Sequence, residues 1–169
     1  MKVIYNDGHV AECAPEEELH ILRHSAAHIL AQAVKNLYPQ AHFAYGPATE
    51  SGFYYDIDTD VLIDEAMMEK LEKEMKEIAK RGLAISRFEL SKEEALAKYA
   101  NNEYKTELIN ELPEGETISF YEQGGEFTDL CAGPHLTSTG KLKAVKLTQC
   151  TGAYLHGDSK NKMLQRVYG

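Results

Sequence analysis

The sequence lacks several features that would assign it to a class at once. It has no tryptophan, and its three cysteines (Cys13, Cys131 and Cys150) are too few and odd in number for a disulfide framework, which favours a reducing compartment. No apolar run approaches the roughly 20 residues of a membrane span. The N-terminus, MKVIYNDGHVAEC, has no apolar stretch of a secretory signal. We therefore expect a cytoplasmic protein with no membrane partner.

Basic charge is also scarce. The formal net charge is −9, whereas a protein that wraps nucleic acid is usually basic overall. Residues 136–169 are the exception, with six basic and one acidic side chain, against 12 basic and 26 acidic ones in residues 1–135. If the protein binds a polyanion, we expect residues 136–169 to contact it. The alternative interpretation is that these lysines are scattered over the surface and only increase solubility. The candidate contacts are Lys141, Lys143, Lys160 and Lys162.

Several catalytic motifs are absent. The sequence contains no G-x-x-x-x-G-K-[ST], no G-x-G-x-x-G and no G-x-S-x-G. No ATP site, dinucleotide site or serine nucleophile elbow is therefore predicted.

Local signals predict one domain of mixed helices and strands, since 169 residues suffice for a single core. A hairpin at residues 2–13 has Asp7-Gly8 at its turn. Helices are expected from Pro15 to just before Pro39, over residues 64–81 with Gly82 as the C-cap, over 91–99 from a Ser91-x-x-Glu94 capping box, and over 104–111. Strands are expected near 42–46, 52–57, 83–90, 117–122, 126–131, 143–149 and 163–168. The absence of a regular βαβ rhythm indicates an α+β fold with a largely antiparallel sheet and the long first helix packed on it.

Two short motifs bring histidine and cysteine together. His24 and His28 are four residues apart in the first predicted helix, so both rings project from one face. Cys131 and His135 form C-x-x-x-H at the end of a predicted strand, and Gly133-Pro134 between them forces a turn. Four nitrogen and sulfur groups suit a tetrahedral zinc site. They equally suit a metal-free hydrolytic pocket in which histidines position water.

Two other chemistries are weaker readings of the same residues. The H-x-x-x-H pair lacks the glutamate of H-E-x-x-H, so a metalloprotease would have no general base. A Cys131 thiolate activated by histidine is possible in principle. Cys13 and Cys150 show that the chain also uses cysteine elsewhere, as a small apolar residue.

Four segments resemble one known family. RHSAAHILAQAV, YGPATESGFYYDID, FTDLCAGPH and TGAYLHGDSKNKMLQRVYG, in this order, are similar to the bacterial threonyl-tRNA synthetase editing domain. Alanyl-tRNA synthetases and their free-standing editing relatives share the H-x-x-x-H and C-x-x-x-H motifs, but GFYYD and the long C-terminal segment look threonyl-type. The resemblance covers residues 19–169 and implies the second additional domain fold of these synthetases.

The resemblance implies hydrolysis of serine wrongly esterified to threonine tRNA. A synthetic site cannot strongly reject a substrate that lacks one methyl group, because that difference is worth roughly 1–3 kcal/mol. Carried over by motif, His24, His28, Cys131 and His135 match the editing pocket. Lys105 would place water or stabilise negative charge, Asp129 would hold the substrate ammonium, and Tyr55 would line the pocket.

The same resemblance sets expectations for domains, cofactors and partners. Residues 1–18 would be a short hairpin extension and residues 19–169 the editing domain, with no TGS domain and no aminoacylation core. The chain would be a fragment of a synthetase or a free-standing factor. No cofactor would be required, although zinc on the histidine–cysteine group is possible. The partners would be the acceptor end of tRNA(Thr) carrying serine and, for a fragment, the aminoacylation core. There are two alternatives. One is an alanyl-type deacylase that uses zinc, and the other is a non-catalytic module that binds zinc or a tRNA end.

Overall fold

The computed structural model describes residues 1–116 and 118–169. Its strands are β1 (Lys2–Ile4), β2 (Val10–Glu12), β3 (His42–Phe43), β4 (Tyr54–Asp58), β5 (Ile85–Leu90), β6 (Ile118–Gln123), β7 (Phe127–Leu130), β8 (His135–Leu136), β9 (Gln149–Tyr154) and β10 (Met163–Tyr168). Its helices are α1 (Glu18–Leu37), α2 (Glu65–Arg81), α3 (Lys92–Lys98) and α4 (Glu103–Glu111), with 3-10 turns η1 (Pro15–Glu17), η2 (Thr139–Lys141) and η3 (Leu155–Gly157).

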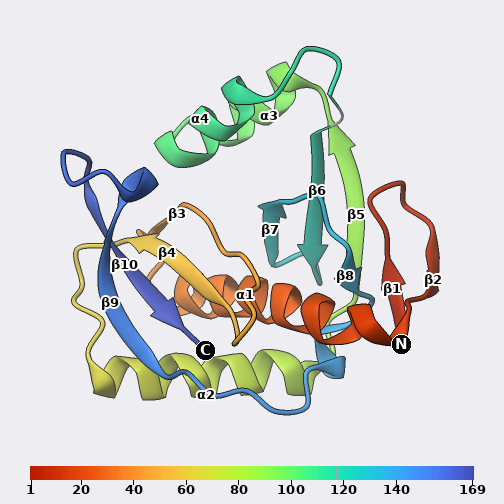
Figure 1. Cartoon of the computed structure of the whole chain (residues 1–169), viewed down its shortest axis with the longest axis horizontal. Helices are drawn as coiled ribbons and strands as arrows, with labels where there is room; N and C mark the ends of the chain where they lie inside the picture. The colour runs from red at the N-terminus through yellow and green to blue at the C-terminus, as the bar shows by residue number, and fades with distance from the viewer. Residues whose placement is uncertain (117) are drawn as a thin grey trace.

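The strands form small antiparallel sheets around one central helix. Their orders are β2-β1-β8, β3-β4-β10-β9 and β5-β6-β7, and every strand pair in the described residues is antiparallel. Figure 1 shows α1 crossing the middle of the molecule, α2 along one side of it, and α3 and α4 at the opposite end. The predicted α+β class is therefore confirmed.

Helix α1 is the axis of the core. It begins after Pro15, which suits a first helical turn, and ends before Pro39. Residues 25–34 are all buried, because α2 and the four-stranded sheet cover one side of the helix and β8 lies against another. A helix surrounded in this way can carry polar side chains only where they find partners. His28 and Gln32 are such residues, and both are buried.

Helix α2 follows the capping rules closely. The Asp64 side chain accepts a hydrogen bond from the backbone N–H of Met67 at 2.9 Å, and Gly82 ends the helix with φ 61°. One face buries Leu71, Met75 and Ile78 against α1. No helix of the described residues is long and apolar enough to cross a membrane.

The expected strand at 143–149 is wrong. Residues 142–148 form no strand, and β9 begins at Gln149. Val145 and Leu147 alternate like strand residues because both pack in the core, but the backbone N–H of Leu147 donates to the Glu72 carboxylate at 2.9 Å. The two-residue strand β8 was not expected. Position 117 of the expected strand 117–122 lies outside the described residues.

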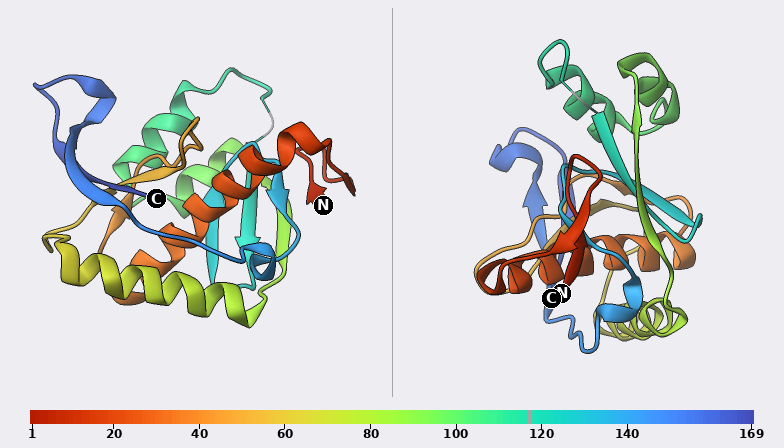
Figure 2. Two further views of the ribbon diagram at one scale, coloured as in Figure 1. Left: turned by 60° about the horizontal axis from the view of Figure 1, so that its bottom comes forward. Right: turned by 90° about the vertical axis from the view of Figure 1, so that its right-hand side faces the viewer.

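The N-terminal hairpin forms as expected, with Gly8 at φ 91° in its turn. Strand β1 also pairs with β8, so that Ile4 lies opposite His135. The two views of Figure 2 show this hairpin against the N-terminal end of α1. The hairpin therefore supports the segment that carries His135, and its assignment as an extension separate from residues 19–169 stays a prediction.

Candidate functional site

Five separate parts of the chain line a cavity of about 230 Å³. Helix α1, the loop after β3, β4, α4 and the end of β7 all contribute to it. Of the predicted site residues, the lining contains His24, His28, Tyr55, Lys105, Asp129 and Cys131. His135 lies directly behind them, with its ring centroid 4.3 Å from those of His24 and His28. The structure thus brings all seven predicted pocket residues together.

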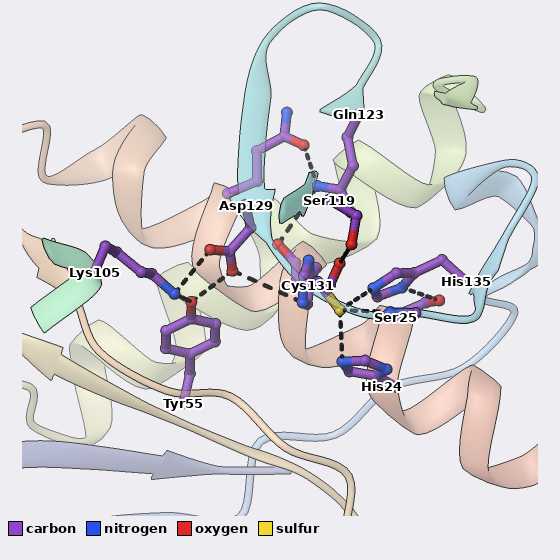
Figure 3. A network of polar contacts seen from close by, with 12 residues as sticks. His24, Ser25, Tyr55, Lys105, Ser119, Gln123, Asp129, Cys131 and His135 are labelled. Atoms are coloured by element: carbon purple, nitrogen blue, oxygen red, sulfur yellow. Dashed lines mark hydrogen bonds and ion pairs between the residues drawn. The ribbon is translucent and has the colours of Figure 1, made fainter. Parts of the chain in front are cut away.

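A buried charge pair occupies one wall of the cavity. The Lys105 ammonium lies 2.9 Å from Oδ1 of Asp129 and donates to the Tyr55 hydroxyl at 3.0 Å. The Tyr55 hydroxyl donates to Oδ2 of Asp129 at 2.5 Å, as Figure 3 shows. The Lys105 and Asp129 side chains are only 3% and 4% exposed. Each charge therefore depends on the other in place of water.

Local structure fixes each member of this wall. The Asn102 side chain caps α4 by accepting from the backbone N–H groups of Tyr104 and Lys105, which sets the direction of the Lys105 side chain. Gly46 lies against the face of Tyr55, where a Cβ atom would overlap the ring. The backbone of Gly46 and the ring of Tyr55 therefore pack directly on one another.

The histidine–cysteine group forms the other wall. Sγ of Cys131 lies 3.2 Å from Nε2 of His24 and 3.1 Å from Nε2 of His135, and it accepts from the backbone N–H of Gly133 at 3.1 Å. His28 links the two walls, since its Nε2 is 3.7 Å from Oδ2 of Asp129. The two walls therefore meet at His28, whose ring also contacts those of His24 and His135.

Burial keeps this group uncharged. Burial, assisted by the nearby His20, lowers the pKa of His24 to about 4, and burial lowers the pKa of His28 and of His135 well below the usual value. Burial raises the pKa of the Cys131 thiol to about 12. At neutral pH the histidines are thus neutral hydrogen-bonding groups, and the thiol is protonated. The sequence-based alternative of a Cys131 thiolate nucleophile is disfavoured, because the thiolate is the reactive form.

The same four residues form a group that could hold a metal ion. One nitrogen or sulfur atom from each of His24, His28, Cys131 and His135 lies within 4.8 Å of the others. Such a donor set fits a tetrahedral zinc ion, for which Zn–N is about 2.0–2.1 Å and Zn–S about 2.3 Å. The geometry therefore leaves open both sequence-based hypotheses, a zinc site and a metal-free pocket.

The four candidate lysines fall into two groups. Lys141 is in η2, beside α2 and the N-terminal hairpin, and its Nζ donates to the backbone carbonyl of Lys2 at 3.0 Å. Lys143 follows it and is exposed. Lys160 and Lys162 are in the β9–β10 connection, where Lys162 pairs with Asp58 at 2.8 Å. Figures 1 and 2 show these segments at opposite ends of the molecule, so the four do not form one patch.

Sequence reasoning missed three buried residues around the site. Ser25 contacts the ring of His135, Ser119 donates to the Cys131 carbonyl at 2.6 Å, and Gln123 donates to Oε1 of Gln32 at 2.7 Å behind His28. No motif marks them. Ser25 had one usable signal: it is a polar residue in the middle of an apolar helix face, beside His24.

Comparison with known proteins finds one matching family model and a set of similar chains. Residues 118–168 match the family described as threonyl and alanyl tRNA synthetase second additional domain. The chain is 61% identical over 156 residues to a threonine–tRNA ligase of Clostridium tetani. The aligned region covers 91% of this chain and 24% of the relative. Residues 118–168 of this chain are therefore similar to the second additional domain of these synthetases.

Other relatives agree. A threonine–tRNA ligase of Clostridium botulinum (strain Langeland) is 60% identical over 150 residues, covering 88% of this chain and 24% of the relative. A threonine–tRNA ligase of Clostridioides difficile is 58% identical over 156 residues, and the aligned region covers 91% of this chain and 24% of the relative. The chain spans about a quarter of the length of these relatives. The matched residues therefore correspond to one region of a longer chain in each of these relatives.

Proposed function

We propose that the domain hydrolyses the ester that joins serine to threonine tRNA, as the editing domain of a threonyl-tRNA synthetase. The observation that carries the proposal is the small cavity whose wall holds a buried ammonium, a buried carboxylate and a neutral imidazole. At about 230 Å³ it is below the roughly 300–1,000 Å³ of common ligand pockets. It suits an aminoacyl group, while the terminal nucleoside stays outside.

The cavity walls can orient a seryl ester. Asp129 accepts one hydrogen bond on each carboxylate oxygen, and a carboxylate has about four acceptor positions. The remaining positions can receive the α-ammonium group of the substrate. Lys105 can then stabilise negative charge on the carbonyl oxygen during attack. The close packing of Gly46 on Tyr55 keeps the cavity narrow, which favours serine over threonine with its extra methyl group.

Water attack needs an acceptor at the reacting centre. In this proposal Nε2 of neutral His24 accepts a hydrogen bond from the attacking water and directs its oxygen at the ester carbon. The water oxygen bonds to that carbon, and the bond from carbon to the ribose oxygen breaks. The proton lost by water goes to the ribose oxygen, so that a carboxylic acid and a ribose hydroxyl result. No covalent enzyme intermediate is required.

The test is single-turnover hydrolysis of purified aminoacyl-tRNAs. We expect seryl-tRNA(Thr) to be hydrolysed and threonyl-tRNA(Thr) to be largely spared. Lys105→Met should lose most of the rate, and the exposed Lys76→Met on α2 should keep it. Equal rates on both esters would refute the selection by size. In a longer enzyme, the aminoacylation core would supply the mischarged tRNA.

The four-ligand group supports a second candidate, a zinc-dependent deacylase of the alanyl type. His24, His28, Cys131 and His135 would hold the ion, which would act as a Lewis acid near the ester. One tightly held zinc per chain, loss of activity on chelation, and a preference for seryl-tRNA(Ala) over seryl-tRNA(Thr) would identify this candidate.

A further inference from the structure

A chain of hydrogen bonds runs along the buried side of the histidine–cysteine group. The backbone N–H of Leu136 donates to Oγ of Ser25 at 3.1 Å, and that oxygen is 2.9 Å from Nδ1 of His135. Nε2 of His135 contacts Sγ of Cys131, which in turn contacts Nε2 of His24. We call these five residues the relay. Figure 3 shows its side chains in sequence from Ser25 to His24.

The first link has a fixed direction. A backbone N–H can only donate, so Ser25 accepts from Leu136. Ser25 is fully buried, and apart from the N–H of Leu136 its hydroxyl has only one hydrogen-bonding partner among the described residues, Nδ1 of His135. If Nδ1 carried the proton, the Ser25 hydroxyl hydrogen would be buried without an acceptor, which proteins avoid. Ser25 therefore donates to Nδ1, and His135 carries its proton on Nε2.

This direction propagates to the cavity. His135 donates from Nε2 to Sγ of Cys131, which also accepts from the backbone N–H of Gly133. With two donors directed at the sulfur, the thiol hydrogen is free to donate to Nε2 of His24. His24 then carries its proton on Nδ1. Each donor from Leu136 to Cys131 thus meets one acceptor.

We propose that Ser25 is a positioning residue that fixes the tautomer of His135 and, through Cys131, the tautomer of His24. The relay leaves the Nε2 lone pair of His24 at the cavity wall, held there by the hydrogen of a thiol. A thiol is a weak donor, so an incoming water can replace it at Nε2. The effect of Ser25 on hydrolysis rests on the proposed function, whereas the order of hydrogen bonds does not.

Imidazole nitrogen NMR tests the order directly. The full 169-residue chain, labelled with 15N-histidine and treated with a chelator, gives long-range proton–nitrogen spectra that distinguish the two neutral tautomers. Single histidine-to-glutamine variants assign the signals. We expect His135 protonated on Nε2 and His24 protonated on Nδ1. A proton on Nδ1 of His135 in the wild-type chain would overturn the proposal without any variant.

Two serine variants separate positioning from packing. Ser25→Ala removes the donor to Nδ1, so His135 and His24 should no longer be confined to these tautomers, and Ser25→Thr should restore the wild-type pattern. Ser119→Ala is the matched control, because it removes a buried hydroxyl that contacts Cys131 only at its backbone carbonyl. It should leave both tautomers unchanged. Wild-type tautomers in Ser25→Ala would contradict the role given to Ser25.

The kinetic readout is the single-turnover rate at saturating enzyme. Ser25→Ala should lower this rate roughly 10–100-fold, as loss of a supporting hydrogen bond does at other polar sites, with the half-saturating concentration unchanged. A wild-type chain with the expected tautomers but no hydrolysis would refute the proposed function alone. Active wild-type protein with the opposite tautomers would refute the relay alone.

Discussion

The charge pair in the cavity wall predicts an asymmetric response to mutation. Asp129→Asn keeps the shape of the side chain but leaves the Lys105 ammonium buried with no counter-charge, since that group is 3% exposed and its other partner is the neutral Tyr55 hydroxyl. Removing one partner of a buried pair costs about 3–5 kcal/mol. For a chain of this size each kcal/mol lowers the unfolding midpoint by about 2–4 °C, so the expected shift is roughly 6–20 °C.

The double variant Lys105→Met/Asp129→Asn is the informative comparison. It removes both charges, and replacing a whole buried pair by neutral groups is often close to neutral in stability. Urea unfolding should therefore show the double variant to be more stable than Asp129→Asn alone. Lys76→Met is the control, because the Lys76 side chain is 58% exposed and its contact with Glu72, at 3.4 Å, is worth at most about 1 kcal/mol. A double variant as unstable as the sum of its singles would refute a mutually dependent pair.

Three further outcomes are expected. His24→Ala and Lys105→Ala should each lower the single-turnover rate by roughly 10²–10⁴-fold with little change in tRNA binding, and unchanged maximal rates would mean that the chemistry is assigned to the wrong residues. Burial lowers the pKa of His24 to about 4 from 6.5, so the unfolded chain binds more protons than the folded chain between these pH values. The urea concentration at the unfolding midpoint should therefore fall as the pH drops from 6.5 toward 4. A midpoint that does not change with pH would contradict a buried neutral imidazole. Neutralising the pairs Lys141/Lys143 and Lys160/Lys162 separately should show which end of the molecule meets tRNA, because only the contacting pair should reduce the salt dependence of binding; an effect of neither would put the tRNA path elsewhere.

The helices and the residues that line the pocket could be predicted from the sequence, because local patterns or motifs mark them. Pro15, Pro39, Asp64 and Gly82 mark helix ends through backbone constraints that act within a few residues. The resemblance to a known family supplied Lys105, Asp129 and Tyr55 as pocket residues. It did not supply their mutual contacts, which join residues far apart in the chain.

The failures have physical causes. An alternating apolar pattern reports burial and not hydrogen-bond pairing, so Val145 and Leu147 suggested a strand in what is a packed loop. Charge counting grouped Lys141 with Lys162 because they are close in sequence, although the fold sends them to opposite ends. No motif marks Ser25, because its functional contact is with the Nδ1 atom of His135, a residue 110 positions away in the chain.

The place of β10 in its sheet has a consequence for how the domain is made. This strand follows all the others in the chain, yet it lies between β4 and β9 in the four-stranded sheet. At a ribosomal rate of about 5–20 residues per second, β4 waits several seconds for this partner. Val167 and Leu164 on β10, both buried, are synthesised after every other strand of the described residues. Strand β4, which carries Tyr55 into the cavity, pairs with Val167 of β10, so the strand beneath this wall has no hydrogen-bonded neighbour on that side until β10 has emerged from the ribosome.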